Sequence, residues 1–202
     1  MPIRIRDYEK YLNVLWALIA LSLAYETFRE ILLIPELSLI VWFLLHCIAA
    51  LLFFIRSKPI RYSSSILAYC VALASVNYYL LYTPLPAPGL PLIGKTLTFL
   101  GGMMGIVSTL SLGKCFGILP VYRGVQTSAA YRFVRHPIYA SYILLDSGIV
   151  ITYPSWENFL VFCMAILLFV LRIRYEEDVL QQADAYLAYQ QKVKFKLIPL
   201  VY

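Results

Sequence analysis

Charged side chains are scarce in this sequence. Asp, Glu, Lys and Arg together make up 14% of its 202 residues, whereas roughly 25% is typical of soluble domains. Hydrophobic residues account for 61%. This composition excludes a soluble globular domain and predicts an integral membrane protein. The 17 tyrosines suit the membrane interface, where the aromatic ring meets lipid and the hydroxyl group meets water.

Paired cysteines and histidine clusters are also missing from the sequence. Cys47, Cys70, Cys115 and Cys163 lie far apart, without a Cys-x-x-Cys pair or accompanying histidines. The sequence therefore predicts neither a metal site nor a disulfide framework. The formal net charge is +6, but the basic residues fall between hydrophobic runs and form no long basic stripe. Anionic lipid headgroups are the expected counter-charge, and nucleic-acid binding is excluded.

What the sequence does contain is a series of apolar segments, each near the ~20 residues that cross a bilayer as a helix. They cover residues 12–28, 37–55, 64–82, 91–112, 138–153 and 156–171. Only Pro154 and Ser155 separate the last two, which are short, so they should form a tight antiparallel helical hairpin. The expected fold is all-α, a polytopic integral membrane protein of about six transmembrane helices followed by a cytosolic C-terminal helix.

The basic residues indicate how these segments are oriented. On a six-span arrangement, all of the 17 Lys and Arg residues except Arg29 and Lys95 fall on one side. Cytosolic loops accumulate Lys and Arg, so both termini and the polar stretches 113–137 and 172–202 are expected to be cytosolic. These two stretches flank the short hairpin. They should therefore lie close together and draw on cytosolic cofactors.

The first polar stretch ends in Arg135-His136-Pro137-Ile138-Tyr139. Proline disfavours helical geometry in the residue before it and suits the first position of a helix. A helix should therefore begin at Pro137, with His136 at its N-terminus. The backbone N–H groups there are expected to be free to bind an anion, beside an imidazole or tyrosine hydroxyl that holds a polar ligand. The alternative is a helix start at which Arg135 and His136 contact lipid headgroups and nothing else.

The second polar stretch begins where the last apolar segment ends. Arg172 and Glu176 are four residues apart and share one face of a helix. An arginine at the membrane boundary is suited to hold an anionic substrate group, while the carboxylate orients it or faces a cationic ligand. The alternative is a solvated helix end with a weak ion pair, worth at most ~0.5 kcal/mol.

Further along the second stretch, a stripe at helical spacing predicts a short amphipathic helix, a pattern more common in packing than in binding. The stripe consists of Leu180, Tyr186, Tyr189 and Val193. The two-residue hairpin should bring it close to His136 and to the Arg172–Glu176 pair.

From residue 112 onward, a set of short motifs follows in a fixed order. They are Leu112-Gly113-Lys114-Cys115-Phe116, Arg123-Gly124, Thr127, Tyr131-Arg132, Arg135-His136-Pro137-Ile138-Tyr139, Arg172 with Glu176-Glu177, Leu180, Tyr186-Leu187-Ala188-Tyr189, Val193 and Leu197-Ile198-Pro199. In this order and spacing the set resembles the isoprenylcysteine carboxyl methyltransferase and phospholipid methyltransferase superfamily, especially its short bacterial members. The resemblance covers residues 112–202, slightly less than half of the chain.

The resemblance implies an S-adenosylmethionine-dependent membrane methyltransferase. The two cytosolic segments and the last helices would enclose the cofactor, and a tunnel from the lipid side would admit a lipophilic or lipidated substrate. Arg172 and Glu176 are the implied catalytic residues, with Arg172 addressing the methyl acceptor. The implied cofactor-binding residues are Tyr131, His136, Pro137, Tyr139, Glu177, Tyr186 and Tyr189.

The methyl acceptor stays open at this point. A carboxylate is ionised at neutral pH and needs no general base, so Arg172 would have only to position it. This carboxyl O-methylation, of the isoprenylcysteine type, is the first choice. An amine, as in N-methylation of a phospholipid, must lose a proton before it attacks, which would give weight to Glu176 or to Asp146 in the fifth apolar segment. A non-enzymatic membrane module that keeps the fold is the third alternative.

One departure from the family pattern concerns the backbone before the Arg-His-Pro motif. Ala129-Ala130-Tyr131 stands where many relatives have Gly-Pro-Tyr. The change is tolerable only if the positive φ that glycine adopts readily is not required at this position.

The sequence thus divides into N-terminal transmembrane helices over residues 1–111 and a methyltransferase region over residues 112–202. The expected location is the bacterial inner membrane, among membrane lipids, with the active site on the cytosolic face. The sequence predicts no oligomeric state.

Overall fold

The computed structural model describes residues 5–83 and 89–198, and it is helical almost throughout. The helices are α1 (Ile5–Leu33), α2 (Leu37–Ile55), α3 (Ile66–Ala74), α4 (Pro91–Leu112), α5 (Pro137–Thr152), α6 (Trp156–Leu180) and α7 (Asp184–Lys192). One two-stranded antiparallel sheet pairs β1 (Arg61–Tyr62) with β2 (Val121–Tyr122). The all-helical expectation is confirmed apart from this short sheet.

Four of the described helices are long and apolar enough to cross a bilayer: α1 from Tyr8, α2, α4 with the turn to Cys115, and α6. They indicate an integral membrane protein. The expected six uniform spans are not found in residues 5–83 and 89–198. Segment 138–153 forms the 16-residue helix α5, and segment 64–82 is broken into α3 and a 3₁₀ turn at Tyr78–Leu81.

Polar side chains explain why segment 64–82 breaks after Ala74. The Ser75 hydroxyl donates to Ala72 O at 2.8 Å, and the Asn77 side-chain amide donates to Leu73 O at 2.8 Å. Such bonds compete with the backbone N–H groups that would continue the helix. The break leaves Ser75, which is 2% exposed, facing α6.

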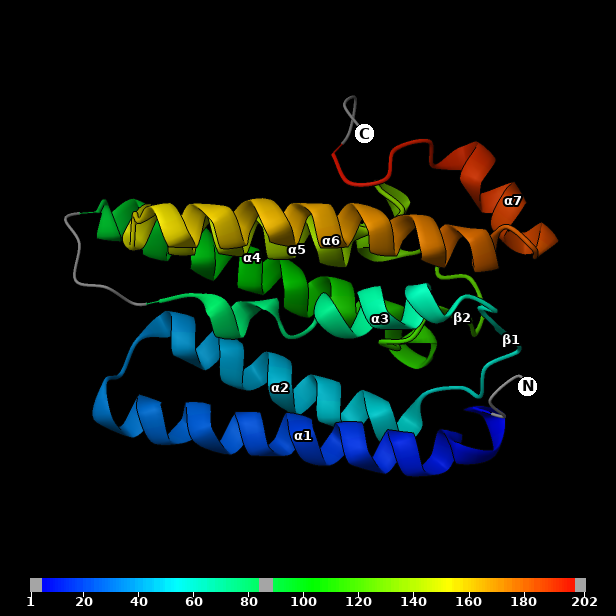
Figure 1. Cartoon of the computed structure of the whole chain (residues 1–202), viewed down its shortest axis with the longest axis horizontal. Coiled ribbons are helices and arrows are strands. Elements are labelled where there is room, and N and C mark those ends of the chain that lie inside the picture. The colour runs from blue at the N-terminus through cyan, green and yellow to red at the C-terminus, as the bar shows by residue number, and fades with distance from the viewer. Residues whose placement is uncertain (1–4, 84–88, 199–202) are drawn as a thin grey trace.

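The helices run lengthwise beside one another, as Figure 1 shows. α1 pairs with α2 on one side of the molecule, α4 to α6 form the other side, and in this view the α3 segment runs between α2 and α6. The start of α1, both strands and α7 gather at one end of the helices. The two polar stretches of the sequence therefore meet at that end.

The expected hairpin of α5 and α6 is confirmed. α5 ends at Thr152 and α6 begins at Trp156, with Ser155 accepting a hydrogen bond from the Asn158 N–H as the N-cap. The Asn158 side chain, fully buried, donates to the carbonyls of Tyr153 and Thr83. These bonds satisfy the backbone groups that the tight turn leaves unpaired.

α5 is held against α4 by direct backbone contact. A Cβ atom added to Gly148 of α5 would lie 2.4 Å from Gly94 O, and one added to Gly101 of α4 would lie 2.5 Å from Leu145 N. Small residues at helix interfaces allow this approach in membranes. The contact fixes the position of α5, whose first turn carries His136 and Tyr139.

The loop before α5 corrects one expectation. Alanine in place of the family's glycine was expected to be tolerable only if this position has a negative φ, but Ala129 has φ +49°. An L-residue in this region costs roughly 1–2 kcal/mol. The chain therefore retains the left-handed geometry that glycine would adopt without strain.

Candidate active site

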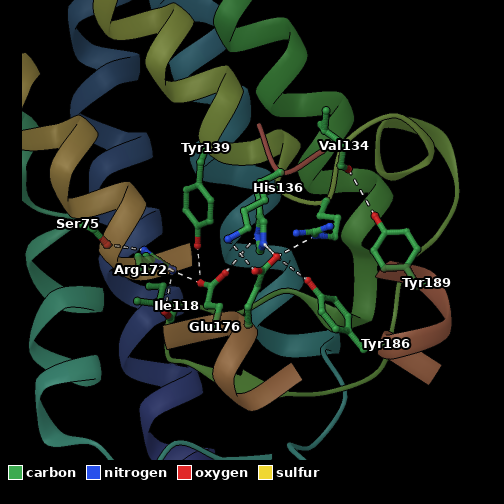
Figure 2. Close-up of polar contacts among 12 residues, drawn as sticks. Ser75, Ile118, Val134, His136, Tyr139, Arg172, Glu176, Tyr186 and Tyr189 are labelled. Atoms are coloured by element: carbon green, nitrogen blue, oxygen red, sulfur yellow. Dashed lines mark hydrogen bonds and ion pairs between the residues drawn. The ribbon is translucent and has the colours of Figure 1, made fainter. Parts of the chain in front are cut away.

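The predicted site residues converge at the end of the helices where the two polar stretches meet. α5 begins at Pro137 with His136 as its N-cap, as the proline predicted. Tyr139 lies in the first turn of α5, Arg172 and Glu176 lie in the last third of α6, and the tyrosines of α7 lie opposite. Figure 2 shows Tyr139 and Arg172 pointing toward Glu176, with His136 and Tyr186 nearby, while Tyr189 points toward Val134.

Glu176 is the acceptor at the centre of the first half of this network. Its Oε1 accepts from Arg172 Nε at 3.0 Å and from the Tyr139 hydroxyl, while its Oε2 lies 3.8 Å from His136 Nδ1. The Arg172 side chain is 6% exposed and that of Glu176 19% exposed. The alternative of a solvated helix end with a weak ion pair is therefore wrong for this pair.

Arg172 also ties three separate segments to α6. Its Nη1 donates to the Ser75 hydroxyl at 2.8 Å and its Nη2 donates to Ile118 O at 2.7 Å. The guanidinium lies 5.4 Å from the centre of the Tyr139 ring, a cation–π distance. Three of its five N–H groups are used in these bonds, so two remain for a ligand.

Glu177 accepts from the second half of the network. Arg135 Nε at 2.9 Å, His136 Nε2 at 3.2 Å and the Tyr186 hydroxyl at 3.2 Å all reach Oε1, and Lys196 Nζ lies 3.1 Å from Oε2. The Glu177 side chain is 6% exposed. A carboxylate with this many cationic and donor partners positions its neighbours, among them His136.

The C-terminal tail covers part of the start of α5. The Arg135 N–H donates to Phe195 O at 3.0 Å, and the His136 N–H donates to Lys196 O at 2.8 Å. Both groups are already bonded because the tail folds back over the start of the helix. An anion at this helix start would have to bind other N–H groups, and its binding there stays a prediction.

α7 is the amphipathic helix that the tyrosine spacing predicted, and it buries Tyr186 and Tyr189. The Tyr189 hydroxyl donates to Tyr131 O at 2.6 Å. Burial raises the pKa of Tyr189 to about 12, against the opposing effect of nearby Arg135. Its hydroxyl therefore stays protonated and keeps donating at neutral pH.

A cavity of about 150 Å³ lies inside this arrangement. Its wall includes every predicted site residue except Pro137 and Glu177, namely Tyr131, His136, Tyr139, Arg172, Glu176, Tyr186 and Tyr189. Pro137 shapes the helix start, and Glu177 holds His136 from behind. Neither residue lines the cavity, so the geometry does not support direct contact of either one with a cofactor.

A second, mainly apolar cavity of about 380 Å³ adjoins the first one. It lies between α1, α2 and residues 75–80, and aromatic residues such as Trp16 and Trp42 line it. The two cavities share four wall residues: Val76, Phe116, Ile118 and Tyr142. A cavity lined in part by charged side chains thus lies beside a more apolar one.

Residues 91–185 match the family model for phospholipid methyltransferase. The predicted resemblance to this superfamily is thereby confirmed. The matched segment runs from α4 to the start of α7 and includes Tyr131, His136, Arg172 and Glu176. The match indicates an enzyme, a methyltransferase that acts on lipid substrates. No curated protein matches the chain.

Several residues of this candidate site were not among the predicted ones. Arg135 and Lys196 pair with Glu177, and the position of Arg135 beside His136 in the motif was an available signal. Ser75 and Ile118 O bind Arg172, but neither had a signal, because a serine in an apolar segment and a backbone carbonyl carry no motif.

The described part of the chain offers no set of metal ligands at this candidate site. Within residues 5–83 and 89–198, no group of three or more His, Cys, Asp or Glu side chains is placed to hold a metal ion. The clustered carboxylates, Glu176 and Glu177, are instead bonded to arginine, lysine, histidine and tyrosine.

Proposed function

We propose that this protein transfers a methyl group from S-adenosylmethionine to a lipophilic acceptor, at the cavity walled by Arg172 and Glu176. The observation that carries the proposal is that this cavity, lined by charged side chains and tyrosines, shares wall residues with the apolar cavity. A charged cofactor and the polar end of a lipid fit the first, and an apolar chain fits the second. The charged cavity is lined mainly by residues from 112 onward and the apolar cavity mainly by the first three apolar segments, so both parts of the chain are needed.

The donor set suits this cofactor. The Glu176 carboxylate and the Tyr139 ring complement a cationic sulfonium or ammonium group, and Tyr131 adds a buried aromatic surface. The first cavity alone, at about 150 Å³, is smaller than the ~300–1,000 Å³ usual for ligand sites, whereas the adjoining apolar cavity, at about 380 Å³, lies in that range. When bound, S-adenosylmethionine supplies an activated methyl group. The protein then has to align the acceptor and exclude water.

Carboxyl O-methylation is the acceptor chemistry that the geometry favours. Glu176 Oε1 already accepts from both Arg172 and Tyr139, so this oxygen is engaged in positioning these two side chains. A carboxylate acceptor needs no base. The two N–H groups left on Arg172 can orient it. The product is an uncharged methyl ester.

N-methylation of a phospholipid amine is the second candidate. It is favoured by the description of the matching family and by Glu176 Oε2, which lies 3.8 Å from His136 Nδ1, beyond hydrogen-bond distance. This oxygen has lone pairs that can take the proton an amine must lose before attack. Asp146 is placed less well, because it does not line the cavity and its Oδ2 accepts from the Tyr78 hydroxyl at 2.6 Å.

The proposed placement has both termini and the site on the cytosolic face of a bacterial inner membrane. It is supported by the Lys and Arg residues of the segments around β1, β2 and α7, because these elements lie at one end of the helices (Figure 1). Residues 1–111 would then supply wall helices for the lipid chain, and residues 112–202 the methyl-transfer site. A non-enzymatic module with this fold would instead tolerate Glu176→Gln without loss of function.

Membranes containing the protein, incubated with methyl-labelled S-adenosylmethionine, test the proposal. We expect label in the lipid fraction, reduced about 100-fold or more by Glu176→Gln, and unchanged by the matched control Asp178→Asn, which alters an exposed carboxylate two residues away. A methyl ester releases volatile methanol in base, whereas an N-methyl group does not. Absence of label from all lipids, or equal labelling by Glu176→Gln, would refute the proposal.

A further inference from the structure

A buried cluster of three charged side chains stands beside the cavity, outside the Arg172–Glu176 network. Arg123, which follows β2, donates through Nη2 to Glu9 Oε1 of α1 at 2.7 Å. Arg56, which follows α2, donates through Nη2 to the same oxygen at 3.2 Å. The side chains of Arg123, Arg56 and Glu9 are 2%, 3% and 11% exposed. Of the three, Arg123 lines the cavity.

This cluster holds two cations and one anion. Burial, and then repulsion from Arg123, lowers the pKa of Arg56 to about 10, which leaves Arg56 charged at neutral pH. The remaining partners of the two guanidinium groups are uncharged, Asn13 Oδ1 for Arg56 and Ser57 O for Arg123. A buried charge without a counter-ion is costly. One negative charge would balance the cluster.

One donor of the cluster is also unused. Arg123 Nε is buried and has no hydrogen-bond partner in the described part of the chain, and leaving a buried donor unsatisfied is unfavourable. Gly117, another cavity residue, lies against it. A Cβ atom there would be 3.3 Å from Arg123 Nε and 3.4 Å from Arg56 Nη1, so both guanidinium groups approach the same glycine.

We propose that Arg123, supported by Arg56, binds an oxyanion group of a ligand in this cavity. The unused Nε–H and the excess positive charge identify the ligand group as a carboxylate or a phosphate. Glu9 holds the two guanidinium groups together against their mutual repulsion. The proposal rests on the proposed function for its two candidate sources, the carboxylate of the cofactor and the phosphate of a lipid headgroup.

Paired probes on the purified full-length protein distinguish these sources by calorimetry. S-adenosylhomocysteine is compared with 5′-methylthioadenosine, which lacks the amino-acid carboxylate. Dioctanoyl phosphatidic acid is compared with dioctanoylglycerol, which lacks the phosphate. The variant is Arg123→Gln. Its matched control is Arg132→Gln, which removes the same charge at an exposed position in the 3₁₀ turn Ala129–Arg132.

Arg123→Gln should weaken one oxyanion-bearing probe about 10- to 100-fold, as expected for loss of a charged hydrogen bond, and leave its truncated partner unchanged. An effect on S-adenosylhomocysteine assigns the site to the cofactor, and an effect on the phosphatidic acid assigns it to the lipid. Arg123→Lys, which keeps the charge but lacks Nε, should give an intermediate loss. Equal binding by Arg123→Gln and the wild type for every probe would overturn the anion site, as would binding of none.

Folding and binding effects can be separated within the same cluster. Arg123→Gln leaves Arg56 and Glu9 as a balanced pair, so its melting temperature should stay close to that of the wild type. Glu9→Gln leaves two buried cations and should lower it clearly. Failure of the wild type to bind S-adenosylhomocysteine would count against the proposed function. If the wild type binds the probes and Arg123→Gln binds each of them with the same affinity, the result would count against the anion site alone.

Discussion

Replacing Glu177 with glutamine should destabilise the protein much more than a change at either of its carboxylate neighbours. Glu177 is 4% exposed and is the shared acceptor of Arg135, His136, Tyr186 and Lys196. Glutamine keeps the shape and one carbonyl oxygen but removes the negative charge. The arginine and the lysine then lose their common counter-ion in a buried setting.

Removing one partner from a buried ion pair costs about 3–5 kcal/mol. We expect the lower end for Glu177→Gln, because the amide oxygen still accepts one hydrogen bond and Lys196 is 24% exposed. For a chain of about this size, 1 kcal/mol corresponds to about 2–4 °C, so the melting temperature should fall by about 6–12 °C.

Thermal unfolding of the purified protein in detergent measures this directly. Asp178→Asn is the control, since it removes the next carboxylate on α6 from an exposed position and should shift the melting temperature by less than about 2 °C. Glu176→Gln should lie between the two, because its carboxylate has fewer partners and is more exposed. If the melting temperatures of Glu177→Gln and Asp178→Asn are equal, Glu177 is not the central counter-ion of this network.

Three further substitutions test separate parts of the structure. Ala129→Gly should raise the free energy of unfolding by about 1 kcal/mol, because glycine adopts the positive φ without strain. Ala130→Gly, the control, should lower it by about 0.5–1 kcal/mol. Chemical denaturation that ranks the two variants in the opposite order would show that Ala129 is not strained. Tyr78→Phe should lower thermal stability by about 1–3 kcal/mol, because it leaves the buried Asp146 carboxyl without its donor, and Tyr78→Phe combined with Asp146→Leu should recover part of that loss. Tyr189 has a pKa raised to about 12 in the folded state, so its contribution is complete below pH 10 and is lost as pH rises toward 12; Tyr189→Phe should show a smaller alkaline loss of stability than the wild type, and an identical loss would refute this.

Local rules were sufficient for much of the site. The proline at 137 fixed the start of α5 because its ring restricts both its own φ and the residue before it. The four-residue spacing of Arg172 and Glu176 placed them in contact because helix geometry alone determines it. The short hairpin and the tyrosine-bearing α7 followed from turn length and periodicity in the same way.

Features that depend on distant contacts were beyond the sequence. The break after Ala74 places Ser75 against Arg172, 97 residues later in the chain, and the sequence carries no signal for this contact. The backbone N–H of His136 is taken by Lys196 O because the tail folds back. Hydropathy alone reads segment 64–82 as one uniform helix, since a serine and an asparagine lower its average only slightly. Ala129 adopts a positive φ because the surrounding loop determines it.

Binding of S-adenosylhomocysteine to the purified protein, measured by calorimetry with Glu176→Gln and Asp178→Asn in parallel, decides whether this cavity holds the cofactor. We expect saturable binding by the wild type and by Asp178→Asn, and an affinity about tenfold or more lower for Glu176→Gln, because the carboxylate that faces the cavity is lost. Cofactor binding at Glu176 is contradicted if the folded wild type binds no S-adenosylhomocysteine, or if Glu176→Gln binds it with unchanged affinity.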